Sequence, residues 1–223
     1  MISGNIGDIR DFSEGMLEGM IPSPVISGKE NIPATRSFLL TLNHYSRDGF
    51  SIVWAAAAVS AAMPKKPIWV MTSTWTKRTG LWDKIQTKAT EIIFSRFADV
   101  FGAITMPPMP PQPDEIADRA VSIRKILNRL RAEEDSILCL APEGEDQVDG
   151  YLGRPHPGTG KFISMVCSRL EDIVPVGVYE ESGKLVIQFG LPYKLNENID
   201  DQSVIEQVME HIANLLPEKL IPQ

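Results

Sequence analysis

Short apolar runs alternate along the chain with longer stretches in which apolar residues recur every three or four positions. The runs have the length of β-strands, and several are apolar throughout, which is typical of strands buried on both faces. Six runs are expected to form strands: residues 37–42, 67–71, 101–105, 137–141, 173–178 and 184–189.

Two of the longer stretches carry the clearest helical pattern. Apolar residues between 116 and 130 fall on one side of a helix that would follow Asp114, while basic and acidic residues fill its other side. A second helix is expected from a cap at Ser203 to Leu216. The prolines of residues 106–113 exclude both a helix and a central strand, so this segment is expected to be a loop.

The alternation of strands and helices predicts an α/β fold, with a mostly parallel central sheet flanked by helices. The turn sequence EESG at 180–183 predicts that the last two runs form an antiparallel hairpin at the edge of the sheet. We divide the chain into an N-terminal segment, residues 1–24, and one domain, residues 25–223. The first residues lack the pattern of a secretory signal. The longest uncharged run, residues 49–64, is too short to span a bilayer as a helix.

Composition narrows the class of protein. The 223 residues include 22 Lys and Arg against 29 Asp and Glu, a net charge of −7, which argues against nucleic-acid binding through overall charge. The two cysteines and three histidines are scattered, without the spacing of a metal site or a disulfide framework. We therefore expect a cytoplasmic protein with no metal and no bound cofactor.

Candidate chemistry follows two of the expected strands. Ligands of open α/β sheets bind at the carboxyl ends of strands, which directs attention to residues 43–49 and 142–146. If the chain turns helical at once, His44 and Asp48 share one face, and the carboxylate can orient the imidazole as a general base for a hydroxyl. An ordinary helix start, with His44 as a cap and Asp48 as a first-turn acid, fits the same spacing.

Four blocks follow one another in the chain: Gly28, Glu30, Asn31, Ile32 and Pro33; then Asn43, His44, Ser46 and Asp48; then APEG at 141–144; then IVPV at 173–176, with FGLPYKL closing at 189–195. Their order and spacing resemble the phospholipid/glycerol acyltransferase family, the group of lysophosphatidic acid and glycerol-3-phosphate acyltransferases. The resemblance covers residues 25 to about 193.

The resemblance implies direct acyl transfer from a thioester, on coenzyme A or acyl carrier protein, to a hydroxyl of a lipid-type acceptor. It implies His44 as the base on that hydroxyl and Asp48 as its orienting partner. Substrate binding is expected from Glu143 and Gly144, and from two further residues of the histidine block, Asn43 and Ser46.

The sequence departs from the family pattern in three places. Three residues instead of four separate His44 from Asp48, which on a helix turns the side chain by about 100°. Two family arginines are missing, one after Pro-Glu-Gly and one at the end of the third expected strand; both are phosphate-binding cations in the family. The residues that could substitute for them are Arg47, Arg154, His156 and Lys161.

These departures leave two alternatives to a phosphate-binding acyltransferase. One is a catalytically degenerate relative that binds lipid or acyl chains. The other is an acyltransferase with a non-phosphate acceptor, such as a sugar, ornithine-type lipid or polyketide hydroxyl.

The glycine-rich residues 150–160 are expected to lead into a helix whose start is available to an anion.

Basic residues and tryptophans gather in one segment of the chain, residues 64–88. Residues 64–88 hold six basic residues and one acidic residue, interleaved with Trp69, Trp75 and Trp82. Such a segment suits an anionic bilayer surface, which predicts peripheral contact with the inner membrane face. An ordinary arrangement, with Trp69 in the core and the lysines in solvent, fits equally well.

Overall fold

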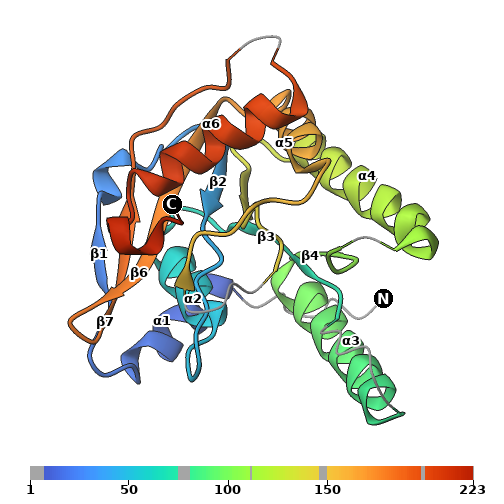
Figure 1. Ribbon diagram of the computed structural model, residues 1–223, viewed down its shortest axis with the longest axis horizontal. Coiled ribbons are helices and arrows are strands. Elements are labelled where there is room, and N and C mark those ends of the chain that lie inside the picture. The colour runs from blue at the N-terminus through green and yellow to red at the C-terminus, as the bar shows by residue number, and fades with distance from the viewer. Residues whose placement is uncertain (1–7, 75–80, 111, 146–149, 197–198, 223) are drawn as a thin grey trace.

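A computed structural model of the protein describes residues 8–74, 81–110, 112–145, 150–196 and 199–222, with the main chain alone for 81–86. Within these ranges, seven strands form one sheet with helices on both faces (Figure 1). The strands are β1 (Val25–Ser27), β2 (Phe38–Leu42), β3 (Ile68–Thr72), β4 (Ile104–Met106), β5 (Ile137–Leu140), β6 (Asp172–Glu181) and β7 (Lys184–Phe189). The helices are α1 (Ile9–Glu18), α2 (Ile52–Ala62), α3 (Leu81–Phe101), α4 (Ile116–Ala132), α5 (Thr159–Cys167) and α6 (Asp201–Ala213), with short 3-10 helices η1 (Lys29–Asn31), η2 (Pro113–Glu115) and η4 (Glu218–Leu220).

The strand order of the sheet is β1-β7-β6-β2-β5-β3-β4. The only antiparallel neighbours in the described sheet are β6 and β7, and every other neighbouring pair is parallel. This arrangement confirms the α/β fold, the mostly parallel sheet and the predicted hairpin. Strand β1 pairs with β7 on its outer side, so the hairpin lies one strand in from the edge. Three residues are too few to show a periodicity, and β1 was therefore not predicted.

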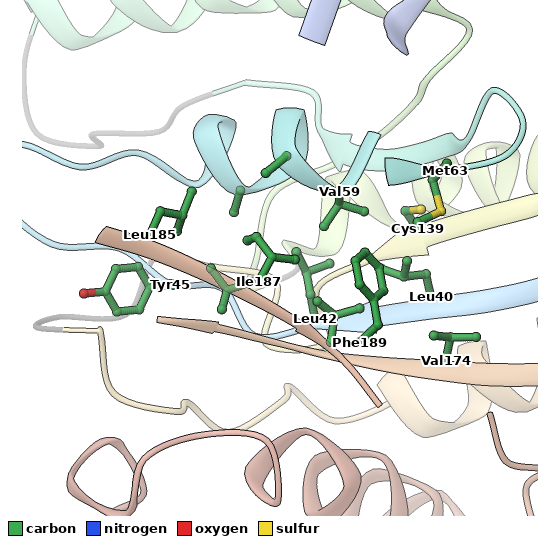
Figure 2. Close-up of a cluster of buried hydrophobic side chains, with 14 of the residues drawn as sticks. Leu40, Leu42, Tyr45, Val59, Met63, Cys139, Val174, Leu185, Ile187 and Phe189 are labelled. Carbon is green, nitrogen blue, oxygen red and sulfur yellow. The ribbon is translucent and has the colours of Figure 1, made fainter. Parts of the chain in front are cut away.

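Strand β2 lies at the centre of the sheet and is buried along its whole length. Successive side chains of a strand point to opposite faces. Phe38, Leu40 and Leu42 accordingly join one apolar cluster, with residues of α2, while Leu39 joins another, with residues of α4, α5 and α6. Figure 2 shows the first cluster, with Tyr45 at one end of it and its hydroxyl pointing away from the apolar side chains.

Helix α1 lies in the N-terminal segment, residues 1–24, and packs against α2. Leu17 of this helix, and Met20 just after it, pack against the first apolar cluster. Helices α1 and α2 thus cover one face of the sheet, and α4, α5 and α6 cover the other. Figure 1 shows α3 extending beside β4, at the margin of the molecule.

Several boundaries differ from the sequence predictions. Strand β6 runs to Glu181, three residues past its expected end, so the turn predicted at 180–183 consists of Ser182 and Gly183 alone. The third expected strand begins at Ile104 because Phe101 still belongs to α3, which Gly102 ends with a φ of 70°. Helix α6 starts at Asp201, and its cap is Asp200, whose Oδ1 accepts from the Ser203 N–H at 2.8 Å. The cap prediction at Ser203 was wrong by three residues, because Asp200 caps the helix and the Ser203 N–H is the group that it accepts from. The expected proline loop is confirmed at 107–110.

Candidate active site

The chain does not turn helical after β2. Residues 43–46 are irregular, and a tight turn follows in which the Phe50 N–H donates to the Arg47 carbonyl at 3.0 Å. Gly49 takes the left-handed conformation that this turn needs, with a φ of 78°. Helix α2 starts only at Ile52. His44 and Asp48 are therefore not placed on one helical face.

Asn43 joins the end of β2 to β6. It is 1% exposed. Its Nδ2 donates to the Val178 carbonyl at 2.8 Å, and its Oδ1 accepts from the Val178 N–H at 2.7 Å. The amide thus continues the pairing of the two strands past the end of β2, and its polar atoms are engaged by main chain.

His44 and Glu143 meet at the carboxyl ends of the neighbouring strands β2 and β5. The His44 main-chain N–H donates to Glu143 Oε2, and the Gly153 N–H donates to Oε1 at 2.8 Å. Glu143 is 0% exposed. Burial raises the pKa of its carboxyl to about 7, although the two N–H donors lower it. Glu143 therefore connects its own loop, through its side chain, to the main chain of two other loops.

Tyr45, Arg47 and Glu180 form a second polar cluster beside His44. The Tyr45 hydroxyl donates to Glu180 Oε2 at 2.9 Å, Arg47 Nη2 donates to Oε1 at 2.7 Å, and Arg47 Nε donates to Oε2. Burial, and then the Glu180 carboxylate, raise the pKa of Tyr45 to about 12. Arg47 Nη1 donates to the Asp48 carbonyl at 2.6 Å, so each of its three nitrogens has an acceptor.

Gly150 packs directly on Tyr45. A Cβ at Gly150 would fall 2.4 Å from Tyr45 Cε2, and the φ of Gly150 is 73°. The roles of Tyr45, Gly150 and Glu180 were not predicted from the sequence. Glu180 lies near the end of β6, the neighbour of β2, and this position could have indicated that it belongs to the site. The sequence prediction assigned it to the hairpin turn at 180–183 instead.

Asp48 is exposed, and its carboxylate makes no hydrogen bond or ion pair with any residue in the described ranges. Ser46 is half-buried. The structure therefore brings His44 next to Glu143 and leaves Asp48 on the surface of the turn.

The proline loop lies over the Pro-Glu-Gly turn. A Cβ at Gly144 would fall 3.0 Å from Met109 Cγ, so the methionine side chain lies against the glycine. Arg119 of α4 holds this loop, since its Nη2 donates to the carbonyls of Pro107 and Pro108 at 2.9 and 3.0 Å. The sequence pattern indicated only that Arg119 lies on the polar side of its helix.

The start of α5 is already occupied by a carboxylate. Asp201 accepts from the N–H groups of Gly158 at 3.2 Å and Lys161 at 2.6 Å. The expectation that this helix start is available to an anion was wrong, because a side chain of α6 fills it. Lys161 and Arg154 are both exposed.

His156 Nε2 lies 3.2 Å from Glu145 Oε1. Within the described residues, no group of three or more His, Cys, Asp and Glu side chains could hold a metal ion.

The basic segment 64–88 is described only in part. Trp69 Nε1 donates to Ser60 Oγ at 2.9 Å and the ring packs against the first apolar cluster. Lys65 pairs with Asp135 at 2.5 Å. Trp75 lies outside the described residues, as do Lys77 and Arg78, and the side chain of Trp82 is not described either. No helix in the described ranges has the length and hydropathy to cross a membrane.

Comparisons with known proteins bear on the fold and the family of the chain. Among solved structures, the chain is similar to the 1-acyl-sn-glycerophosphate (LPA) acyltransferase PlsC from Thermotoga maritima, with 14% sequence identity and a TM-score of 0.58. The match covers 93% of this chain and 78% of that chain, and it shows the fold. Curated protein sequences give no significant match.

A family model described as Acyltransferase matches residues 23–179, which is more than half of the chain. The matched region contains both strand ends that meet at His44 and Glu143. The chain therefore belongs to the acyltransferase family.

Proposed function

We propose that the protein transfers a fatty acyl group from a thioester of coenzyme A or acyl carrier protein to a hydroxyl of a lipid-type acceptor, with His44 as general base. One observation carries the proposal: two motif blocks 99 positions apart meet where the His44 N–H donates to Glu143. Membership of the acyltransferase family supports the reaction type. The similarity in fold to an LPA acyltransferase supports a lipid-type acceptor.

In this proposal the His44 imidazole takes the proton of the acceptor hydroxyl as its oxygen attacks the thioester carbonyl carbon. The tetrahedral intermediate then collapses, the carbon–sulfur bond breaks, and the thiolate leaving group takes the proton from the imidazolium. The ester and the free thiol are the products, and no acyl-enzyme forms. General-base catalysis of this kind contributes about 10² to 10⁴ in rate.

Asp48 has no orienting role in this proposal, because its carboxylate is exposed and makes no hydrogen bond or ion pair with any residue of the described ranges. The acceptor hydroxyl is instead placed by groups around the Pro-Glu-Gly turn, including Gly144. Donors for the oxyanion are main-chain N–H groups at these strand ends.

An anionic acceptor needs a cation, and we assign this role to Arg154. It is exposed and directly follows Gly153, whose N–H donates to Glu143. Lys161 is a second exposed candidate in the following helix. Arg47 is poorly suited, because Glu180 already binds it through two of its nitrogens.

The pairing of Arg47 with Glu180 favours one second candidate, an acyltransferase whose acceptor has no phosphate. A phosphate would have to displace this carboxylate to reach Arg47. A panel of acceptors separates the two. Lysophosphatidate as the best acceptor would support the phosphate-binding enzyme, and an uncharged alcohol or amino-alcohol lipid as the best would support the second candidate.

We place the enzyme at the cytoplasmic face of a membrane, with contact through residues 64–88. The test is co-sedimentation with vesicles of mixed neutral and anionic lipids, using the triple variant Trp75→Ala, Lys77→Glu, Arg78→Glu. Binding should drop at least fivefold, whereas Lys65→Glu, which breaks the pair with Asp135, should change it little. Unchanged binding of the triple variant would remove this contact.

The central experiment is thiol release from a panel of acyl-CoA and acyl carrier protein donors, with each acceptor. His44→Ala should lower kcat by about 10² to 10⁴. The control is His211→Gln, which removes a histidine from α6, where its ring stacks on Tyr193. Equal rates of wild type and His44→Ala would dismiss His44 as the base. No turnover by wild type with any donor and acceptor would favour a lipid-binding or acyl-binding relative without activity.

A further inference from the structure

Glu143 is a buried carboxylate whose one charged neighbour acting on its pKa is His44, and that effect is smaller than the effect of burial. Its side chain forms no ion pair with a lysine or arginine of the described ranges, and its two oxygens accept from main-chain N–H groups instead. Burying a carboxylate in this way costs free energy that two hydrogen bonds offset only in part, which agrees with its raised pKa. Stability alone therefore does not explain a glutamate at this position.

Both oxygens of Glu143 are engaged by the protein itself. One oxygen accepts from the His44 N–H and the other from the Gly153 N–H, so each already has a main-chain donor. A side chain that lined the acceptor pocket would instead keep an oxygen exposed, whereas Glu143 is 0% exposed. This placement argues against direct contact with the acceptor.

The neighbours of His44 are held as firmly. Asn43 is bonded twice to the Val178 main chain, and the Tyr45 ring lies between Gly150 and the Glu180 carboxylate. These contacts fix the residues before and after His44. The contact to Glu143 fixes the main chain of His44 itself, and it is the one that also reaches the loop at Gly153.

We propose that Glu143 is a positioning residue, which fixes the main chain of His44 so that the imidazole meets the acceptor hydroxyl, and which links it to the loop at Gly153. This inference rests on the proposed function, in which His44 is the base. A misplacement of about 1 Å can lower the rate of a positioned reaction by about 100-fold. The role therefore acts through kcat rather than through affinity for the acceptor.

The first test is the variant Glu143→Gln. Glutamine keeps the shape of the side chain but has one acceptor oxygen, and its NH₂ group faces one of the two N–H donors. We expect kcat to fall 10-fold to 100-fold, the KM for the acceptor to change less than threefold, and the melting temperature to stay close to that of wild type. The matched control is Glu134→Gln. Glu134 is an exposed carboxylate just before β5, the strand that Glu143 follows, and its substitution should leave kcat and KM unchanged.

A KM rise of tenfold with kcat retained would overturn the proposal, because it would make Glu143 an acceptor contact. Unchanged kinetics would overturn it as well. If Glu143→Gln does not fold, Glu143→Asp takes its place, since it keeps the charge but withdraws the carboxylate by one methylene. The same division between kcat and KM then decides.

A double-mutant cycle tests whether the effect passes through His44. In a His44→Ala background, Glu143→Gln should lower the residual rate by less than threefold, because the group that it positions is absent. A further loss as large as in wild type would overturn the proposal. Should residual rates be too low to measure, the kcat and KM values of the single variants decide. Full activity of His44→Ala would instead refute the proposed function, whatever Glu143→Gln does.

Discussion

Strand β5 has a carboxylate near each of its ends, and the protein surrounds the two in opposite ways. Asp135, before the strand, pairs with Lys65 at 2.5 Å, and the two side chains are 39% and 45% exposed. Glu143, after the strand, is 0% exposed and accepts from the main chain of His44 and Gly153. One end of the strand therefore carries its charge in solvent, and the other carries it in the core.

The difference points to where function resides. An exposed ion pair contributes about 0 to 1 kcal/mol, so its gain or loss has little consequence for folding. A buried carboxylate without a lysine or arginine partner is costly, and such cost is tolerated where a site requires a fixed polar group. The contrast along β5 thus separates a surface end from a site end.

The largest effect is expected at the site end of the neighbouring strand, from Asn43→Ala. The substitution leaves the buried N–H and carbonyl of Val178 without partners, which should lower the free energy of unfolding by about 2 to 5 kcal/mol. Urea denaturation measures this loss. Asn128→Ala, on the exposed side of α4, is the control and should change it by less than about 0.5 kcal/mol. Equal values for the two variants would show that the site end is no more tightly bonded than the surface.

The buried carboxylate should also give stability a pH dependence. The pKa of Glu143 is raised from 4.5 to about 7, so the folded protein keeps this proton at pH values where the unfolded chain has lost it. The free energy of unfolding should therefore fall as pH rises from about 4.5 to 7, by roughly 3 kcal/mol, and level off above. Glu143→Gln should lack this part of the fall. Parallel pH profiles of the two proteins would contradict the assigned burial cost.

The same contrast explains what the sequence could predict. Strands β2, β5 and β7 are apolar runs with clear ends, so their positions and the strand ends carrying His44 and Glu143 followed from the pattern. The rule that ligands gather at carboxyl ends then placed these two residues at one edge of the sheet. Their direct contact at the main chain was not predictable, because it depends on the path of an irregular loop.

The partners of the charged side chains could not be predicted either. Glu180 lies 133 positions from Arg47, and Asp201 lies 40 positions from Lys161, yet each engages the cation or the helix start that the sequence left for a substrate. Local patterns contain the backbone preferences of a segment but not the side chain that another segment brings to it. For this reason the sequence alone favoured anion binding at Arg47 and at the start of α5 more strongly than the structure does.

At the surface end, Lys65→Ala should have a small effect. Both partners of the pair with Asp135 are substantially exposed, so the free energy of unfolding should fall by about 0 to 1 kcal/mol. The loss should shrink further in 1 M salt, which screens exposed charges. A loss above about 2 kcal/mol, or one that persists in high salt, would show that this end of β5 is as tightly coupled as the other.

The smallest effect is expected from Asp48→Asn, although the sequence alone would have made it one of the largest. The turn after β2 leaves the Asp48 carboxylate exposed and without a described partner, so the free energy of unfolding should change by less than about 0.5 kcal/mol. Under the proposed mechanism kcat should change by less than about threefold, against the 10² to 10⁴ expected for His44→Ala. Thiol release by the three proteins, under identical conditions, gives the comparison. A fall of 100-fold or more in Asp48→Asn would mean that the turn refolds onto His44 when substrate binds, and that the base is oriented by Asp48 as well as held by Glu143.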